Sequence, residues 1–127
     1  MNSAEKLYLA PETLYRLGNA SSPLLTRVRP GKIDTIPING VTMIIANGKG
    51  VSLYNKSGLD LAPLSGWVWE IQANTAFPPG LKLIKDAQPP GHYTLSPSRN
   101  MPVQEFVALL ERVVIHCIKV FKKTGVG

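Results

Sequence analysis

Glycine and proline divide this chain into short pieces, and this constrains the fold more than any other feature. The 127 residues include 11 Gly and 11 Pro, which fall between apolar runs along the whole chain. These residues favour turns and interrupt regular structure, so most elements have to be short. Hydrophobic residues make up an ordinary 44%, so the interruptions indicate turns rather than disorder. The length predicts a single domain over residues 1–127, with residues 1–11 as a weakly ordered lead-in.

Alternation of apolar and polar residues predicts six or seven short strands, mostly antiparallel. Asn39-Gly40, between two extended apolar pieces, is a strong hairpin signal. In the last strand His92, Thr94 and Ser96 share one face, and Tyr93 and Leu95 share the other. Residues 56–66 are expected to be irregular. The predicted strands cover residues 12–18, 35–37, 41–46, 51–54, 67–71, 81–86 and 92–97.

The end of the chain carries the one pattern of a long helix. Pro102 suits its first turn, and Gly125 is expected to stop it. Lysines near its end would suit the negative end of the helix dipole, and His116 is expected at the surface. An apolar stripe at helical spacing is formed by Phe106, Leu109, Leu110, Val113, Val114, Cys117, Val120 and Phe121. With the strands, this helix predicts an α+β fold.

The charge of the chain favours anionic partners. The formal net charge is +6, and the sequence pI is about 9.7, which suits nucleic acid, a phosphate-bearing cofactor or an acidic protein. A single cysteine and two separated histidines make a metal site improbable. Residues 1–10 show no signal peptide, and no apolar stretch is long enough to span a membrane. We therefore expect a cytoplasmic protein without a membrane partner, secreted, if at all, without a signal peptide.

Two polar residues on predicted strands are candidates for chemistry, each with an ordinary alternative. His92 either faces a ligand cleft or simply ends a strand edge. Glu70, between apolar residues of its strand, is either partly buried and able to stabilise a cation, or a strand residue that faces water.

Four sequence blocks follow one another in a fixed order. They are residues 14–16, residues 50–54 with Gly58-Leu59, residues 77–83 with Asp86, and residues 92–97 with Met101-Pro102. In this order, closed by His-Tyr-Thr before a Met-Pro helix start, the blocks resemble the small cytotoxic effectors of type VI secretion that have an ADP-ribosyltransferase-like fold. The resemblance covers residues 13–114.

The resemblance implies two small antiparallel sheets, packed roughly at right angles, with NAD bound between them as the substrate. It also implies an intracellular toxin that transfers ADP-ribose to a macromolecule or to water, and an immunity or antitoxin protein that covers the cleft. Arg16 then resembles the residue that anchors the dinucleotide, Ser52 the serine of the second strand, and His92 part of the third motif. An aromatic residue, Tyr54 or Tyr93, would stack on nicotinamide.

The chain departs from the family pattern at two places. Val51 stands where a hydroxyl residue is expected, and no Glu-x-Glu or Gln-x-Glu lies near His92. The glutamate that steadies the ribosyl cation is therefore missing, or is replaced by Glu70 or Glu105.

Two other functions stay open. One is a basic nucleic-acid-binding module that uses Arg27, Arg29, Lys32 and the lysines at the end of the chain. The other is a catalytically inert protein of the same fold that acts only by binding.

Overall fold

The computed structural model describes residues 8–124, which form an α+β fold as predicted. The N-terminal half contains β1 (Leu14–Gly18), the 3-10 helix η1 (Pro30–Lys32), β2 (Thr35–Ile38), β3 (Val41–Ile44), β4 (Val51–Tyr54) and α1 (Lys56–Leu61). The C-terminal half contains β5 (Gly66–Ile71), β6 (Leu81–Lys85), β7 (His92–Pro97), β8 (Met101–Pro102), α2 (Val103–Val114) and β9 (Ile118–Lys123).

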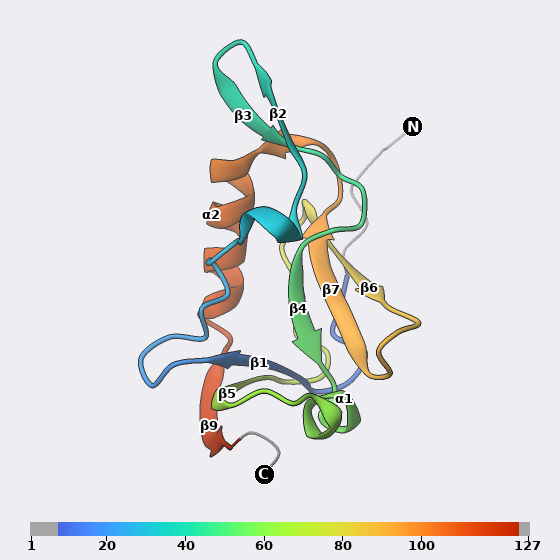
Figure 1. Ribbon diagram of the computed structural model, residues 1–127, viewed down its shortest axis with the longest axis vertical. Coiled ribbons are helices and arrows are strands. Elements are labelled where there is room, and N and C mark those ends of the chain that lie inside the picture. The colour runs from blue at the N-terminus through green and yellow to red at the C-terminus, as the bar shows by residue number, and fades with distance from the viewer. Residues whose placement is uncertain (1–7, 125–127) are drawn as a thin grey trace.

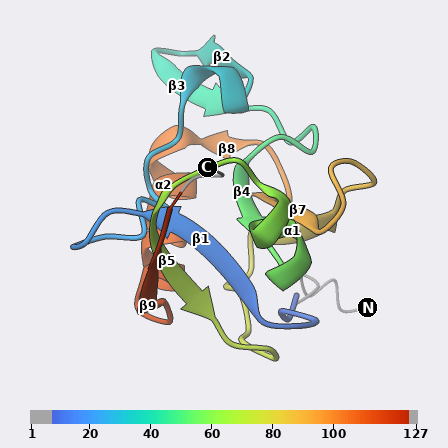
Figure 2. The same cartoon turned by 60° about the horizontal axis from the view of Figure 1, so that its bottom comes forward.

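The main sheet is antiparallel and has six strands in the order β6-β7-β4-β1-β5-β9. Its centre is weakly joined, because β1 and β4 share only the register pair Tyr15–Tyr54, whereas β1 and β5 are paired along all of β1. In Figure 1, β1 and β5 run crosswise beneath β4 and β7. Figure 2, turned so that this end comes forward, shows β1 and β5 side by side. The two crossed sheets expected from the resemblance are thus two halves of one six-stranded sheet. We call these halves, β6-β7-β4 and β1-β5-β9, the half-sheets.

A second, three-stranded sheet has the order β2-β3-β8. Asn39 and Gly40 form the predicted hairpin turn, with φ values of 50° and 80° that allow a tight two-residue connection. The hairpin projects from the body of the molecule (Figure 1), and Ile36, Ile38 and Val41 are exposed on it.

The predicted long C-terminal helix is wrong beyond Val114. The helix α2 ends there, and after a turn the chain continues as β9, which pairs with β5. The apolar residues of 117–121 fit helical spacing by coincidence. The edge of β5 is available for backbone pairing, and this pairing favours a strand. The lysines of this segment therefore lie on a strand and do not face a helix dipole. His116 is exposed in the turn, as expected, and Gly125 lies outside the described residues.

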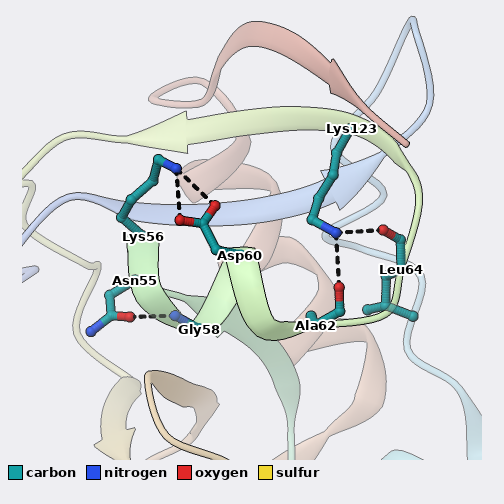
Figure 3. Close-up of polar contacts among 7 residues, drawn as sticks. All are labelled: Asn55, Lys56, Gly58, Asp60, Ala62, Leu64 and Lys123. Atoms are coloured by element: carbon teal, nitrogen blue, oxygen red, sulfur yellow. Dashed lines mark hydrogen bonds and ion pairs between the residues drawn. The ribbon is translucent and has the colours of Figure 1, made fainter. Parts of the chain in front are cut away.

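Residues 56–61, expected to be irregular, form the short helix α1. The side chain of Asn55 caps it, because its Oδ1 accepts a hydrogen bond of 2.8 Å from the Gly58 backbone N–H (Figure 3). Gly58 permits close packing, since a Cβ there would lie 2.5 Å from the carbonyl oxygen of Gly91. The helix is short and only one residue separates it from β4, so the sequence carries little helical periodicity to detect.

The core lies between α2 and the sheets. Phe106 and Leu110 of α2 are fully buried with Leu53 and Leu95 of the main sheet. Tyr93 and Leu95 face this core, which leaves the opposite face of β7 to His92 and Thr94. The first seven residues of the lead-in lie outside the described residues, whereas Ala10 is buried and pairs through its backbone with residues 74 and 75.

Within residues 8–124, no helix combines the length and the apolar character that crossing a bilayer requires.

Candidate active site

A cavity with a volume of about 480 Å³ opens beside the junction of the two half-sheets. Its walls come from β1, β4, the loop of residues 19–32 and the segment after α1. Its charged lining is entirely basic among the described residues. The lining consists of Arg16, Leu17, Gly18, Leu24, Arg27, Arg29, Lys32, Val51, Ser52, Tyr54, Leu64 and Ser65.

Arg16 reaches the cavity from β1, but much of its guanidinium is engaged within the protein. Its Nε, Nη1 and Nη2 atoms donate to the carbonyl oxygens of Pro23 (3.3 Å), Ser52 (3.0 Å) and Leu24 (2.9 Å). Burial lowers the pKa of Arg16, although an arginine stays charged. The side chain therefore ties the 19–32 loop to β4, and two of its five N–H groups remain for a ligand.

Ser52, His92 and Asp86 form a connected row on the polar face of β4 and β7. The Oγ atom of Ser52 lies 2.9 Å from Nε2 of His92. The Nδ1 atom of His92 lies 2.7 Å from Oδ2 of Asp86. The register pairs Ser52 with Thr94 and Tyr54 with His92, so the strand pairing places this row directly. Ser52 lines the cavity, whereas His92 is not among the lining residues and contacts one of them, Ser52.

The two candidate tyrosines have different positions. Tyr54 lines the cavity, and its ring packs edge-on against His92 with ring centroids 5.2 Å apart. Burial raises the pKa of Tyr54. Tyr93 points to the other face of β7, is only 3% exposed, and donates a 2.7 Å hydrogen bond from its hydroxyl to Glu12. The structure therefore brings Tyr54, and not Tyr93, to the cavity.

Neither candidate glutamate is among the residues that line the cavity. Glu70 is half-buried on β5 opposite Tyr15, and Glu105 on α2 forms an ion pair with Arg99. Among residues 8–124, no group of three or more His, Cys, Asp and Glu side chains is placed to hold a metal ion.

A sequence model of the Tse2 ADP-ribosyltransferase toxin family matches residues 12–120. The match includes every strand and helix described here except the end of β9, and with them Arg16, Ser52, Tyr54 and His92. The chain belongs to the Tse2 ADP-ribosyltransferase toxin family. No curated protein matches the chain. The resemblance found in the sequence is thereby confirmed at the level of family and fold.

In this Tse2-family chain, the segment after α1 forms one rim of the cavity, and β9 contacts that segment. Figure 3 shows Lys123 of β9 reaching the carbonyl oxygens of Ala62 and Leu64, both at 2.8 Å. Leu64 and Ser65 line the cavity, so Lys123 fixes this rim. Lys119 donates to the carbonyl of Ala20 at 2.8 Å and lies over the Trp67 ring at 4.8 Å. Both lysines are thus occupied within the fold, which does not favour their use on nucleic acid.

Two acidic residues that contact residues of β7 were not assigned roles from the sequence. Asp86 contacts His92, and Glu12 accepts a hydrogen bond from Tyr93. Glu12 and Asp86 stand at the ends of two predicted strands, and in the structure Glu12 lies just before β1 and Asp86 directly after β6. The β6–β7 hairpin brings Asp86 to His92, since the backbone N–H of Asp86 donates to the His92 carbonyl at 3.0 Å. The signal available in the sequence was a turn with an acid before it and a histidine after it, which is common and therefore weak.

We expect Tyr93→Phe to raise the pKa of Glu12. Hydrogen bonds from Tyr93 and Asn55 hold the pKa of Glu12 below its ordinary value, and burial together with the Glu12 bond raises the pKa of Tyr93 to about 12. Because the folded protein holds the proton on Glu12 less tightly than the unfolded chain, this stabilisation is present above the ordinary carboxyl range and is lost as pH falls through the folded-state pKa. The variant should lose about 1 kcal/mol of unfolding free energy at neutral pH and less in acid. NMR titration of Glu12 measures the change in pKa, and denaturant unfolding at two pH values measures the change in stability. An unchanged Glu12 titration would contradict the claim that the Tyr93 hydrogen bond lowers the pKa of Glu12.

Proposed function

We propose that this chain is an intracellular toxin that binds NAD in the cavity and cleaves the bond between nicotinamide and ribose. ADP-ribose then passes to a macromolecule or to water. The observation that carries the proposal is the cavity itself, which places Ser52 and Tyr54 on one wall and three loop cations on another. A dinucleotide needs this combination of an anion site, a hydroxyl and an aromatic surface.

The phosphates are best matched to the 19–32 loop. Arg27, Arg29 and Lys32 line the cavity, and all three are exposed. Arginine binds phosphate oxygens through two parallel N–H groups. Arg16 contributes its positive charge and its two remaining N–H groups, while its main contacts hold the loop in place. The pyrophosphate anchor is therefore shared between β1 and the loop.

The reacting end of NAD fits the wall formed by β4. Tyr54 offers an aromatic surface for the nicotinamide ring, and Ser52 offers a hydroxyl toward the ribose. His92 is in hydrogen-bond contact with Ser52 and fixes its direction. Cleavage gives the ribose the character of an oxocarbenium ion, so fixed dipoles aimed at that centre lower the barrier.

The double variant Arg27→Gln/Arg29→Gln tests the phosphate site. Charge-assisted hydrogen bonds contribute about 1.5–3 kcal/mol each, so we expect NAD to bind at least about tenfold more weakly. Isothermal titration measures the affinity. NMR shift mapping with NAD should locate the changes at residues 16, 52 and 54.

A second cavity provides the matched control for that experiment. It has a volume of about 280 Å³ and is lined by Ala76, Phe77, Pro78, Pro79, Arg112, Ile115 and His116. The variant Arg112→Gln removes one cation there and should leave NAD binding unchanged. NAD-dependent shifts centred on the second cavity, or equal affinities for both variants, would refute the proposed site.

We further propose that a neutralising immunity or antitoxin protein covers this cavity with an acidic surface. The support is the exposed basic loop. Its residues Arg27, Arg29 and Lys32 complement an acidic protein surface as well as an anionic substrate. Such a partner should compete with NAD, and its association should slow at high salt. Simultaneous binding of NAD and the partner would exclude this arrangement.

A further inference from the structure

The cavity has an electrostatic problem if ribosyl chemistry occurs in it. Its lining includes Arg16, Arg27, Arg29 and Lys32, and no lining residue is acidic. A positive centre that develops on a ribose there is repelled by these cations. The phosphates of the substrate neutralise part of this charge, but an electron-rich group has to face the ribose itself.

Asp86 is a carboxylate connected to the wall of the cavity through other side chains. Its Oδ2 atom accepts a hydrogen bond of 2.7 Å from the hydroxyl of Thr94 and lies 2.7 Å from Nδ1 of His92. The side chains of His92 and Asp86 are 16% and 28% exposed, so water screens this contact only in part. An ionised carboxylate only accepts hydrogen bonds, so Nδ1 of His92 carries a hydrogen.

The position of Asp86 is set by the backbone. Asp86 and His92 close the hairpin between β6 and β7, where the Asp86 N–H donates to the His92 carbonyl at 3.0 Å. Register pairs within β4 and β7 then place His92 beside Tyr54 and Thr94 beside Ser52. The row from Asp86 through His92 to Ser52 is thus held by strand pairing rather than by a flexible loop.

We propose that Asp86 is a positioning residue that makes Ser52 the electron-rich group of the cavity. When the His92 ring is neutral, Asp86 holds it in the tautomer with a hydrogen on Nδ1, so Nε2 accepts the hydrogen of the Ser52 hydroxyl. The lone pairs of Ser52 Oγ then face the cavity, where they stabilise the developing ribosyl cation. This role rests on the proposed cleavage of NAD, whereas the tautomer of His92 does not depend on it.

The variant Asp86→Asn tests the relay, because an amide nitrogen can donate to Nδ1 and so favours a hydrogen on Nε2. Nitrogen-15 NMR at a pH where the ring is neutral reports which ring atom carries the hydrogen. We expect the Nδ1–H form in the parent and a shift toward the Nε2–H form in the variant. Nicotinamide release should fall by about 10²-fold or more in kcat, with KM nearly unchanged, because the phosphate contacts are intact.

The variant Asp60→Asn is the matched control, since it makes the same chemical change at an exposed side chain on α1 that pairs with Lys56. It should match the parent in tautomer and in kcat, and circular dichroism should show that both variants fold. An Nε2–H ring in the parent, or a kcat of Asp86→Asn within twofold of the parent, would overturn the proposal. Failure of the proposed function would give a different result, because the parent, Asp60→Asn and Asp86→Asn would all release no nicotinamide. The proposed role of Ser52 would then be wrong as well. The NMR result would still decide the tautomer of His92.

Discussion

Replacing Ser52 with alanine is expected to reduce nicotinamide release by about 10²–10³-fold, the usual cost of losing one well-placed polar group that contacts the reacting centre. Ser52 lines the cavity, and its Oγ atom lies 2.9 Å from Nε2 of His92. Its side chain is small and only half-buried, so the fold should tolerate the change. The effect should appear in kcat, measured by release of nicotinamide from NAD, with little change in stability.

Ser57→Ala is the matched control for Ser52→Ala. Ser57 lies exposed on α1 and is not among the residues that line the cavity. Its loss should leave nicotinamide release and growth inhibition as in the parent. If Ser52→Ala cleaves NAD as fast as Ser57→Ala, Ser52 has no part in the chemistry and the proposed wall of the active site is wrong.

The second large effect is expected for Arg16→Met, and it should appear first in stability. The variant keeps the length of the side chain but removes the donors to the carbonyls of Pro23, Leu24 and Ser52. Partly buried carbonyls left without donors cost about 1 kcal/mol or more each, so we expect a loss of about 2–4 kcal/mol in the free energy of unfolding. NAD binding should weaken as well, because the 19–32 loop loses its attachment to β4.

Arg112→Met on α2 controls for the loss of one exposed arginine, and its unfolding free energy should stay close to that of the parent. Chemical denaturation followed by tryptophan fluorescence compares the variants. A pure dinucleotide anchor would behave in the opposite way, because Arg16→Met would lose NAD affinity at unchanged stability. That result would contradict the structural role of Arg16 in tying the 19–32 loop to β4. It would instead support Arg16 as the dinucleotide anchor that the sequence resemblance implies.

The strands β1 to β7, the hairpin at Asn39-Gly40 and the buried face of β7 could be predicted from the sequence, because they depend on local alternation and turn chemistry. The end of α2 could not. The apolar residues of 117–121 fit a helical pattern as well as a partial strand pattern, and pairing with the edge of β5 decides between them. Tertiary pairing of this kind overrides local propensity and leaves no mark in the segment itself.

Part of the candidate site was predictable for a similar reason. Ser52, Tyr54 and His92 lie on neighbouring strands, and the register brings them together once β4 pairs with β7. The role of Arg16 in tying the 19–32 loop to β4 was not predictable, because its three acceptors are backbone carbonyls, which carry no sequence signal. Asp86 was also missed as a partner of His92, since a single acid in a turn gains meaning only when the hairpin closes.

The central claim is that the cavity between the two half-sheets cleaves NAD, and the most direct measurement is nicotinamide release by the purified protein. The account predicts that the parent protein frees nicotinamide from NAD, with the remaining ADP-ribose found on a macromolecule or in solution. It also predicts that Ser52→Ala nearly stops this release while Ser57→Ala does not. A folded parent protein that binds NAD at no detectable level and releases no nicotinamide would contradict the claim.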